Sequence, residues 1–555
     1  MLSDIIKLKR ILILPAAALL IIASAGCSGN ETEEANRAAY LKIKEEAISL
    51  YIFLHPLKSS RAGIVSADSS LFIFSMDEIS RAAVRIDRIS NGFSSLTTEG
   101  LSEEEIDNSR LIINFLHEER LALENIRYFT KPVIYCWAAR EALWGIPSRN
   151  MDPYRGEFEN YLGRVRKIPE MLSGARDMID KPSTMHIEIS IDIIDELAEE
   201  MRQLRELVLT RYGGGDGKLD RVFGEIMRFR KFISDTLSAR AKGSIILGRE
   251  NLAGIFKYGE DISVNSDYLV SRAGEKMKVL RQNLQGFAGR MKAVNAEEPE
   301  DPVIDFSVET LSGLAEKIAG GGKVFGIKDR IPDIIRQHPS PYPRENPLLS
   351  IPFGERELIE WIPPCLGNPH SARIAASGSL MEPGGERFRE SAVTFDLARA
   401  AVLAGCCSSS SDTLKTLLGS STYKFGRLER GIENFLKEHQ EGGFHLRKRY
   451  LDWQLLNLAR MIAVFKLHEG KFTVKAAVDF FAESLGATEQ EAMNYIKQAY
   501  VSPSVAYPGI ADIILSDIVS KLAKTGDEKL QRLNTDDLLR DNKLLPLPQI
   551  EKKYF

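Results

Sequence analysis

Apolar residues recur at helical spacing along most of this chain. In the clearest stretch, 187–208, one stripe is formed by Ile187, Ile191, Ile194, Leu197, Met201, Leu204 and Leu207. Such a stripe is typical of an amphipathic helix with one face in a core. The same spacing predicts helices at 223–239, 266–294, 426–437, 451–467 and 474–485. Strand-like runs are short, as at 323–327 and 372–376, so we expect a mainly α fold with at most a small sheet.

Local signals mark where some of these helices begin and end. Gly486 ends the helix at 474–485, and Thr488 with Glu491 forms a capping-box pattern that predicts a further helix at 489–500. The acidic, proline-bearing stretch 295–302 predicts a hinge. We therefore expect a large two-lobed helical scaffold with a central cleft, made of an N-terminal lobe at 37–300 and a C-terminal lobe at 301–555.

The first residues predict a lipoprotein leader. A basic head and a short apolar run are followed by small residues and Cys27, so residues 1–26 are typical of a secretory signal peptide. The residues before Cys27 resemble a lipobox, which predicts that Cys27 is acylated and that residues 27–36 form a polar tether. Ser28 is not the aspartate that retains many lipoproteins at an inner membrane, which favours an outer membrane. The alternative is an ordinary signal peptide with an incidental cysteine.

Composition narrows the class of protein. The chain has 555 residues, of which 44% are hydrophobic and 27% charged, and this excludes a disordered, collagen-like or disulfide-dense chain. Its formal net charge of −4 gives no electrostatic footprint for nucleic acid. Beyond Cys27 the cysteines are Cys136, Cys365, Cys406 and Cys407, and they form no C-x-x-C pair. Buried thiols are favoured for the adjacent pair, and a bridge between distant cysteines stays open.

Familiar catalytic and nucleic-acid-binding motifs are incomplete or have a commoner explanation. The glycine run before Lys323 lacks both the earlier glycine and the Ser/Thr of a phosphate-binding loop. The stretch 474–500 has the spacing of a helix-turn-helix, although a packed helix pair is the commoner structure. The eight histidines include no H-E-x-x-H. His439 and His445 would lie on opposite helix faces, and the glycines after Glu441 would break a helix that joined them.

Several stretches, in this order, match a known pattern. They are 161–169 with 186–188, then 247–252, 460–468 and 503–506. Together they resemble the bacterial domain of unknown function family 885, over about residues 38–520. The resemblance implies a secreted or lipid-anchored, mainly helical protein that is similar to gluzincin-type zinc peptidases.

In that family a helix reads His-Glu-x-x-Pro-Gly-His-His, where histidines bind zinc and the glutamate acts as general base on the metal-bound water. The matching stretch here is 389–396, which ends at Asp396. Glu390 stands at the position of the base, Arg389 at that of the first ligand and Phe395 near the second. The later Glu-Gly-Trp element, which offers a third ligand, is reduced to Gly426.

These replacements do not suit a zinc ion. A guanidinium has no lone pair to donate and cannot be deprotonated in a protein. Its positive charge would repel a divalent ion about 4 Å away by roughly 8 kcal/mol at an effective dielectric near 20. We therefore predict no cofactor, although the resemblance implies zinc. Glu390 is interpreted as a charge partner for Arg389 or Arg387, with a catalytic base as the alternative.

Three functions follow from these observations. The first is a lipid-anchored, non-catalytic protein with a peptidase-like scaffold, whose cleft binds a peptide or an envelope partner and no nucleic acid. The second is a diverged metallohydrolase, with candidates Glu390, Asp396, His439, Glu441 and His468. The third is a structural envelope protein, for which a filled cleft would be typical.

Overall fold

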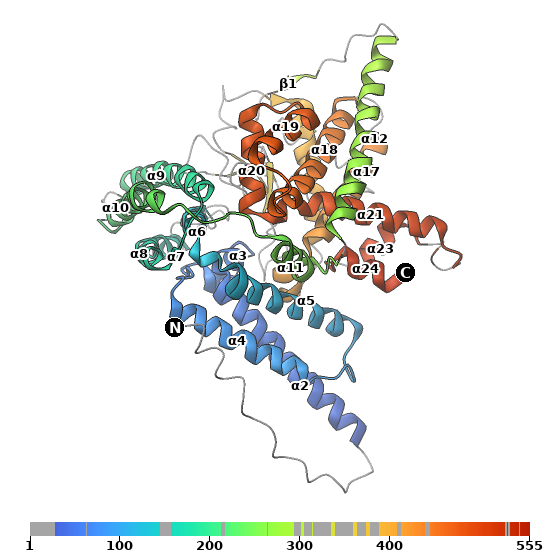
Figure 1. Cartoon of the computed structure of the whole chain (residues 1–555). Helices are drawn as coiled ribbons and strands as arrows, with labels where there is room; N and C mark the ends of the chain where they lie inside the picture. Colours follow the sequence, from blue (N-terminus) through green and yellow to red (C-terminus); the bar gives the residue numbers. More distant parts are fainter. Residues whose placement is uncertain are drawn as a thin grey trace.

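A computed structural model of the chain describes most of the sequence beyond the leader. The described residues are 28–62, 64–144, 157–212, 217–263, 265–293, 388–407, 412–438, 444–527, 533–542 and 544–555, with short stretches at 301–304, 313–314, 335–338, 359–362, 373–377 and residue 530. The fold is mainly α, as predicted (Figure 1).

The first helices form a layer at one end of the molecule. They are α2 (Ser28–Leu54), α3 (Pro56–Arg61), α4 (Met76–Ser94) and α5 (Glu103–Arg120), joined by the short turn η1 (Val65–Ala67) and followed by η2 (Leu121–Ile126) and η3 (Tyr128–Thr130). In Figure 1 the long helices α2, α4 and α5 lie side by side. Their inner faces share a small core that includes Leu50, Ile86 and Phe115. The helix α2 begins at Ser28, so the segment predicted as a tether is helical.

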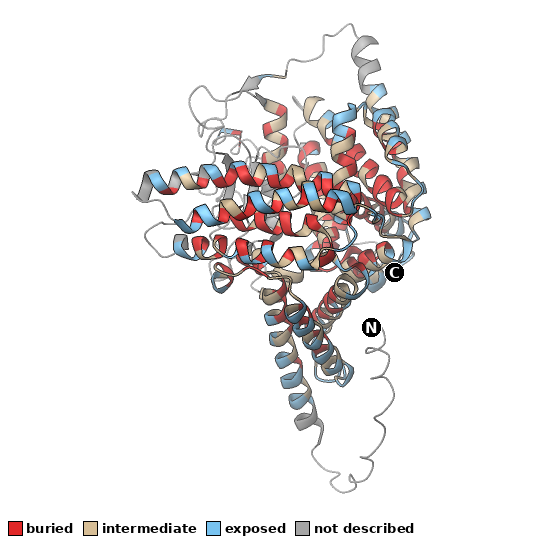
Figure 2. Ribbon diagram, turned by 60° about the vertical axis from the view of Figure 1, so that its left-hand side comes forward, coloured by how far each residue is buried: buried red, intermediate tan, exposed pale blue. Residues whose placement is uncertain are grey.

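A second group of helices lies beside this layer. It contains α6 (Pro132–Trp144), α7 (Glu157–Val165), α8 (Ile168–Met178), α9 (Thr184–Tyr212), α10 (Gly217–Lys231), η5 (Phe232–Leu237) and η6 (Ser238–Arg240). Most of the stripe predicted on α9 is buried: Ile194, Leu197 and Met201 are fully enclosed, whereas Ile191 is half-buried. Figure 2 shows the buried residues gathered on the inner faces of the helices.

The largest core joins α11 and α12 to the C-terminal helices. The helices of this part of the molecule are α11 (Arg249–Glu260), α12 (Ser266–Ala293), α15 (Glu390–Cys407), α16 (Thr413–Leu418), α17 (Ser421–Glu438), α18 (Phe444–His468), α19 (Val474–Leu485), α20 (Glu489–Val501), η9 (Pro503–Ala506), α21 (Tyr507–Lys524), α23 (Thr535–Asp541) and α24 (Leu547–Tyr554). Helix α15 packs against α17 and α18 from outside this core. The central helix is α18, which packs against α12, α15, α19, α20 and α21. A Cβ at Gly509 of α21 would lie 2.7 Å from the carbonyl oxygen of Asn457, so only glycine allows this approach of α21 to α18.

The described strands are short and form two small sheets. Strand β1 (Val303–Ile304) pairs antiparallel with β5 (Phe388–Arg389), and β5 leads directly into α15. In the other sheet β4 (Arg373–Ser377) lies between β2 (Ile335–His338), which is parallel to it, and β3 (Ile359–Ile362), which is antiparallel.

Several predicted boundaries match the structure. Helix α19 has the predicted bounds, and Gly486 after it adopts a φ of +69°. The capping box of α20 is present, with the side chain of Thr488 bonded to the backbone of Glu491 and that of Glu491 to the backbone of Thr488. The predicted hinge near 295–302 and strand at 323–327 lie mostly or wholly outside the described residues. The proposed boundary between lobes near residue 300 stays a prediction.

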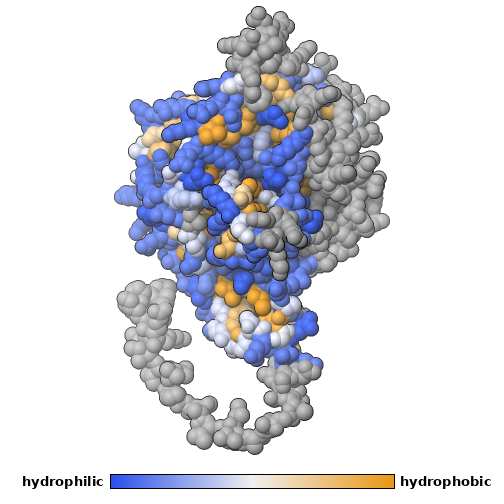
Figure 3. All heavy atoms as spheres, turned by 90° about the vertical axis from the view of Figure 1, so that its right-hand side faces the viewer, coloured by the Kyte–Doolittle hydropathy of each residue, from blue (hydrophilic) through white to orange (hydrophobic). Residues whose placement is uncertain are grey.

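The surface is mainly hydrophilic on the face drawn in Figure 3, with hydrophobic residues scattered among polar ones. The exposed large hydrophobic residues include Leu41, Val84 and Val279, which come from three different helices. None of the helices in the described part of the chain is long and apolar enough to cross a membrane.

Candidate functional site

A cleft of about 680 Å³ lies beside the central helix α18. Helices α12 and α15 contribute two of its walls, and the end of α19 with the start of α20 contributes another. The cleft includes Phe395 and Asp396, the last two positions of the stretch that resembles the metal-binding helix.

Aromatic side chains form an apolar part of an otherwise mainly polar cleft. Phe395 is 6% exposed and meets Trp453 edge to face, with ring centroids 6.2 Å apart. Trp453 also stacks against Tyr450, with ring centroids 6.1 Å apart. Tyr495 also lines the cleft, and the Arg460 guanidinium lies 4.9 Å from its ring centroid. Such packed aromatic groups form rigid surfaces that suit the apolar part of a ligand.

The acidic side chains in the cleft are largely engaged. Asp396 Oδ1 lies 3.4 Å from Nη1 of Arg399, one turn further along α15, and Arg399 also lies over the Trp453 ring at 5.8 Å. Glu491 accepts from the backbone N–H and the hydroxyl of Thr488, both at 2.8 Å. These carboxylates are therefore used within the fold.

Besides Arg399 on α15, two further arginines line the cleft, one on α18 and one on α12. On α18, Arg449 Nε donates to the Ser391 hydroxyl at 2.6 Å, and that hydroxyl donates to Asp301 Oδ2 at 2.6 Å. On α12, Arg281 lines the cleft, and its buried Nε has no hydrogen-bond partner among the described residues.

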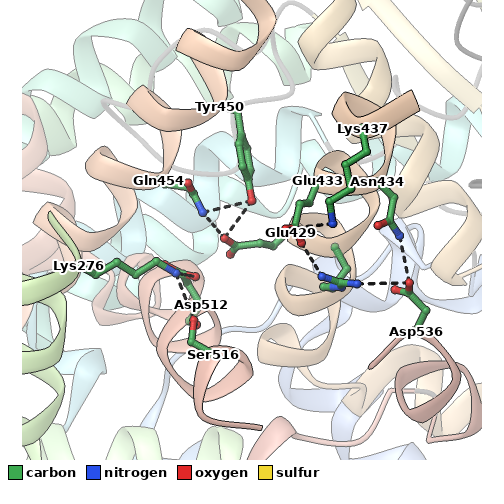
Figure 4. Close-up of polar contacts among 11 residues, drawn as sticks. Lys276, Glu429, Glu433, Asn434, Lys437, Tyr450, Gln454, Asp512, Ser516 and Asp536 are labelled. Carbon is green, nitrogen blue, oxygen red and sulfur yellow. Dashed lines mark hydrogen bonds and ion pairs between the residues drawn. The ribbon is translucent and has the colours of Figure 1, made fainter. Parts of the chain in front are cut away.

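A buried polar cluster lies behind the aromatic wall and joins four helices (Figure 4). Glu429 of α17 accepts at Oε1 from the Tyr450 hydroxyl at 3.2 Å and from the Gln454 amide. Asp512 of α21 accepts from Lys276 of α12 at Oδ1, while its Oδ2 is buried with no donor among the described residues.

The electrostatics of this cluster favour a protonated Glu429. Burial and the nearby Asp512 raise the pKa of Glu429 well above its usual range. Because the Tyr450 hydroxyl and the Gln454 amide both donate to Oε1, a proton on Oε2 can serve the buried oxygen of Asp512. Burial opposes the charge of Lys276, but the attraction of Asp512 outweighs it and raises the pKa of Lys276. Lys276 and Asp512 thus form an ion pair beside a neutral Glu429.

Sequence reasoning missed this cluster, although a signal was present. Glu429 follows the buried Leu428 on the face of α17 that also carries the buried Ile432, and Asp512 interrupts an apolar run in α21. A charged residue on a buried helix face requires a partner, and the partner's identity is decided by packing. The sequence pattern predicted the helices but not which of these groups meet.

A second set of carboxyl groups lies between the N-terminal layer and the largest core, with Glu119 and Glu260 buried and Glu118 half-buried. Glu119 bonds His55 at 2.7 Å, and Glu260 accepts from the hydroxyl and the backbone N–H of Thr422. Burial, followed by repulsion from Glu119, raises the pKa of Glu118 to about 7. These groups cap helices and join elements rather than facing the described cleft.

The residues predicted from the metal motif separate in space and in role. Arg389 is exposed and donates through Nη1 to the Asp301 carbonyl at 2.7 Å. Glu390 is the first residue of α15, and its backbone N–H donates to Pro302 at 2.7 Å. Of this stretch, Ala392, Phe395 and Asp396 line the cleft, whereas Arg389 and Glu390 do not.

His468 is buried at the end of α18. Its Nδ1 accepts from the Leu247 N–H at 3.3 Å, so Nε2 carries the proton and donates to the Ala499 carbonyl at 3.0 Å. Burial lowers its pKa to about 4. Both nitrogens therefore serve the backbone, and the ring joins the loop before α11 to α20. Gly426 has a packing role, because a Cβ there would lie 3.1 Å from Leu547 Cδ1.

The side chains at the implied ligand positions do not fit a zinc ion. Arg389 can only donate, Phe395 has no donor atom, and Gly426 has no side chain. Among the residues that the structure describes, no group of three or more His, Cys, Asp or Glu side chains could hold a metal. His439 and Glu441 lie outside the described residues.

The cysteines are described in part. Cys136 is a buried free thiol whose pKa burial raises to about 12. Cys27 and Cys365 lie outside the described residues, as do the side chains of Cys406 and Cys407.

Comparison with known proteins bears on the fold. No protein-family model matches the chain, and no curated protein matches it. A predicted lipoprotein of unknown function from Shewanella oneidensis superposes with a TM-score of 0.67 at 14% identity, over 93% of this chain and 99% of that one. A predicted lipoprotein from Colwellia psychrerythraea gives a TM-score of 0.64 at 12% identity, over 93% and 98%. The chain has the fold of these two proteins. Membership of family 885 stays a prediction from the sequence.

Proposed function

We propose that this protein is a lipid-anchored envelope protein that binds a peptide, or a peptide segment of an envelope partner, without cleaving it. The peptide would lie in the cleft beside α18. The carrying observation is the combination of an aromatic wall with arginine donors in one open cleft of about 680 Å³. Clefts of this size with a few convergent polar groups suit small ligands and peptide side chains.

The side chains at the metal-motif positions support the non-catalytic part of this proposal. Arg389 and Glu390 are held at the start of α15 by backbone groups of 301–302, and Phe395 is packed against Trp453. A peptidase built on this helix would need imidazoles or carboxylates at the ligand positions.

The proposal that the protein is lipid-anchored rests on its leader and on the fold that it shares with two solved structures. The basic head, apolar run and Cys27 favour acylation at that residue, in line with two neighbours that are predicted lipoproteins. One acyl chain alone binds a membrane weakly, so stable attachment requires more than one chain. An outer membrane is the proposed location in a cell that has one.

The proposal is tested on the full chain purified in detergent. We expect no stoichiometric zinc by elemental analysis, binding of short synthetic peptides by calorimetry, and no cleavage products by mass spectrometry. Stoichiometric zinc that is lost in Glu390→Gln, together with peptide cleavage, would establish a diverged hydrolase instead. Failure to bind any peptide would favour a structural envelope protein. In cells, Cys27→Ala should move the protein from the membrane to the soluble fraction.

A further inference from the structure

We propose that the cleft selects peptides that carry a carboxylate, and that Arg281 and Arg449 bind that carboxylate while an adjacent apolar side chain packs on the aromatic wall around Trp453. This inference rests on the proposed function and adds the chemical class of its ligand. The carboxylate could belong to a peptide C-terminus or to an acidic side chain.

The fold leaves positive charge uncompensated in the cleft. Asp396 pairs with Arg399, Glu491 caps α20, and Asp452 also has a partner within the protein. The remaining acid is Glu483, whose side chain is exposed at the end of α19. The cleft therefore offers more free positive than free negative groups to a ligand.

Arg281 has a hydrogen-bond donor that the fold does not satisfy. Its Nε is buried and makes no hydrogen bond to any described residue. A guanidinium stays charged at all relevant pH values, so this donor cannot be relieved by losing a proton. A buried donor left without a partner carries a desolvation cost. Arg281 also forms no ion pair with a described carboxylate, so its Nη groups can pair with an anion that enters the cleft, although the Nε itself is enclosed.

The guanidinium of Arg449 is held in a fixed direction. Its Nε is held by the Ser391 hydroxyl, which is itself held by Asp301, and within the described part of the chain no carboxylate forms an ion pair with Arg449. One edge of the guanidinium is thus used for positioning. Its Nη groups remain as donors on the wall that α18 contributes to the cleft, whereas Arg281 belongs to α12.

Arginine from two walls is well suited to a carboxylate. Its planar fork matches the two oxygens of that group, and hydrogen bonds between charged partners are about twice as strong as neutral ones. The half-buried Trp453 lies in the same cleft and supplies the apolar contact, backed by the buried Phe395 and Leu456. The combination favours an anionic peptide over a neutral or cationic one.

The test uses four acetylated tetrapeptides that share a phenylalanine. They carry a free C-terminus only, a glutamate with an amidated C-terminus, a glutamine with an amidated C-terminus, or a lysine with an amidated C-terminus. Dissociation constants for the full chain in detergent come from calorimetry. We expect one or both carboxylate peptides to bind at least about tenfold tighter than the other two, which corresponds to about 1.4 kcal/mol.

Variants separate recognition from folding. Arg281→Gln and Arg449→Gln should each weaken the carboxylate peptides about tenfold and leave the glutamine peptide unchanged within about twofold. The matched control is Lys278→Gln, which removes an exposed positive charge from α12 outside the cleft. Thermal unfolding of each variant checks that the fold is kept, and the glutamine peptide reports on the cleft itself.

The outcomes distinguish the two proposals. If all four peptides bind equally, or if both arginine variants weaken every peptide alike, the carboxylate inference is overturned and the peptide-binding function stands. If no peptide binds, both proposals fall. Preference for the free C-terminus or for glutamate identifies which source of carboxylate the cleft selects.

Discussion

Trp453 and Tyr450 stack with ring centroids 6.1 Å apart and planes inclined by 24°, and this pair connects the cleft to the buried polar cluster. Trp453 lines the cleft, while the hydroxyl of Tyr450 donates to Glu429 on the other side. The two rings lie one turn apart on α18, so a single helix carries both the ligand-facing and the core-facing member.

Removing the Tyr450 hydroxyl should affect the cluster and spare the cleft. In Tyr450→Phe the stack is kept, but Glu429 loses a donor, so we expect the free energy of unfolding to fall by about 1–2 kcal/mol. Peptide affinity should change less than about twofold, because the Trp453 surface is retained. Urea unfolding and calorimetry measure the two effects. Tyr500→Phe is the control, since the Tyr500 hydroxyl makes no hydrogen bond to a described residue. Equal costs in the two variants would contradict the assigned role.

The two sides of the buried cluster should respond differently to neutralisation. Lys276→Met leaves Asp512 buried without its cation, and we expect a loss of about 3–5 kcal/mol in the free energy of unfolding. Glu429→Gln should change it by less than about 1 kcal/mol at pH 7, because a protonated Glu429 is already neutral and an amide can donate in its place. Glu433→Gln, on the partly exposed part of α17, is the surface control. A large cost for Glu429→Gln would show that Glu429 is ionised.

Acid should destabilise the protein through His468. Its folded pKa of about 4 lies below the unfolded value of 6.5, so the unfolded chain binds the proton more tightly. The stability that this neutral ring contributes is complete above pH 6.5 and is lost as the pH falls towards 4, by roughly 3 kcal/mol. Urea unfolding at a series of pH values measures the slope. Gln cannot titrate, so the gap in stability between the native chain and His468→Gln should shrink on acidification; a constant gap would refute this assignment.

Glu118 should give the opposite dependence on pH. Its folded pKa of about 7 lies above the usual 4.5, so the folded chain binds the proton more tightly than the unfolded chain does. Stability then falls as the pH rises from 4.5 to 7 and stays lower above that range. Because the side chain is partly exposed, we expect Glu118→Gln to restore only about 1–2 kcal/mol at pH 8, and nothing at pH 4. A gain that is independent of pH would point to packing instead of ionisation.

The candidate site could be predicted from the sequence only in part. The stretch 389–396 led to α15, and three of its members, Ala392, Phe395 and Asp396, line the cleft. Its first two residues, Arg389 and Glu390, are held at the base of the helix by the backbone of 301–302. A resemblance in sequence places residues on a helix, but the direction of each side chain follows from what packs around that helix.

The sequence by itself determined the helices and several of their ends. The spacing of apolar residues set which face of α9 is buried, Gly486 ended α19 and the Thr488–Glu491 capping box started α20, because these effects act within one or two turns. Only the tertiary structure decided that Lys276, Glu429 and Asp512 meet, and that α12, α15, α18 and α20 enclose one cleft. The physical reason is that helical periodicity specifies a buried face, whereas the choice of the opposing face depends on packing among helices that are far apart in the chain.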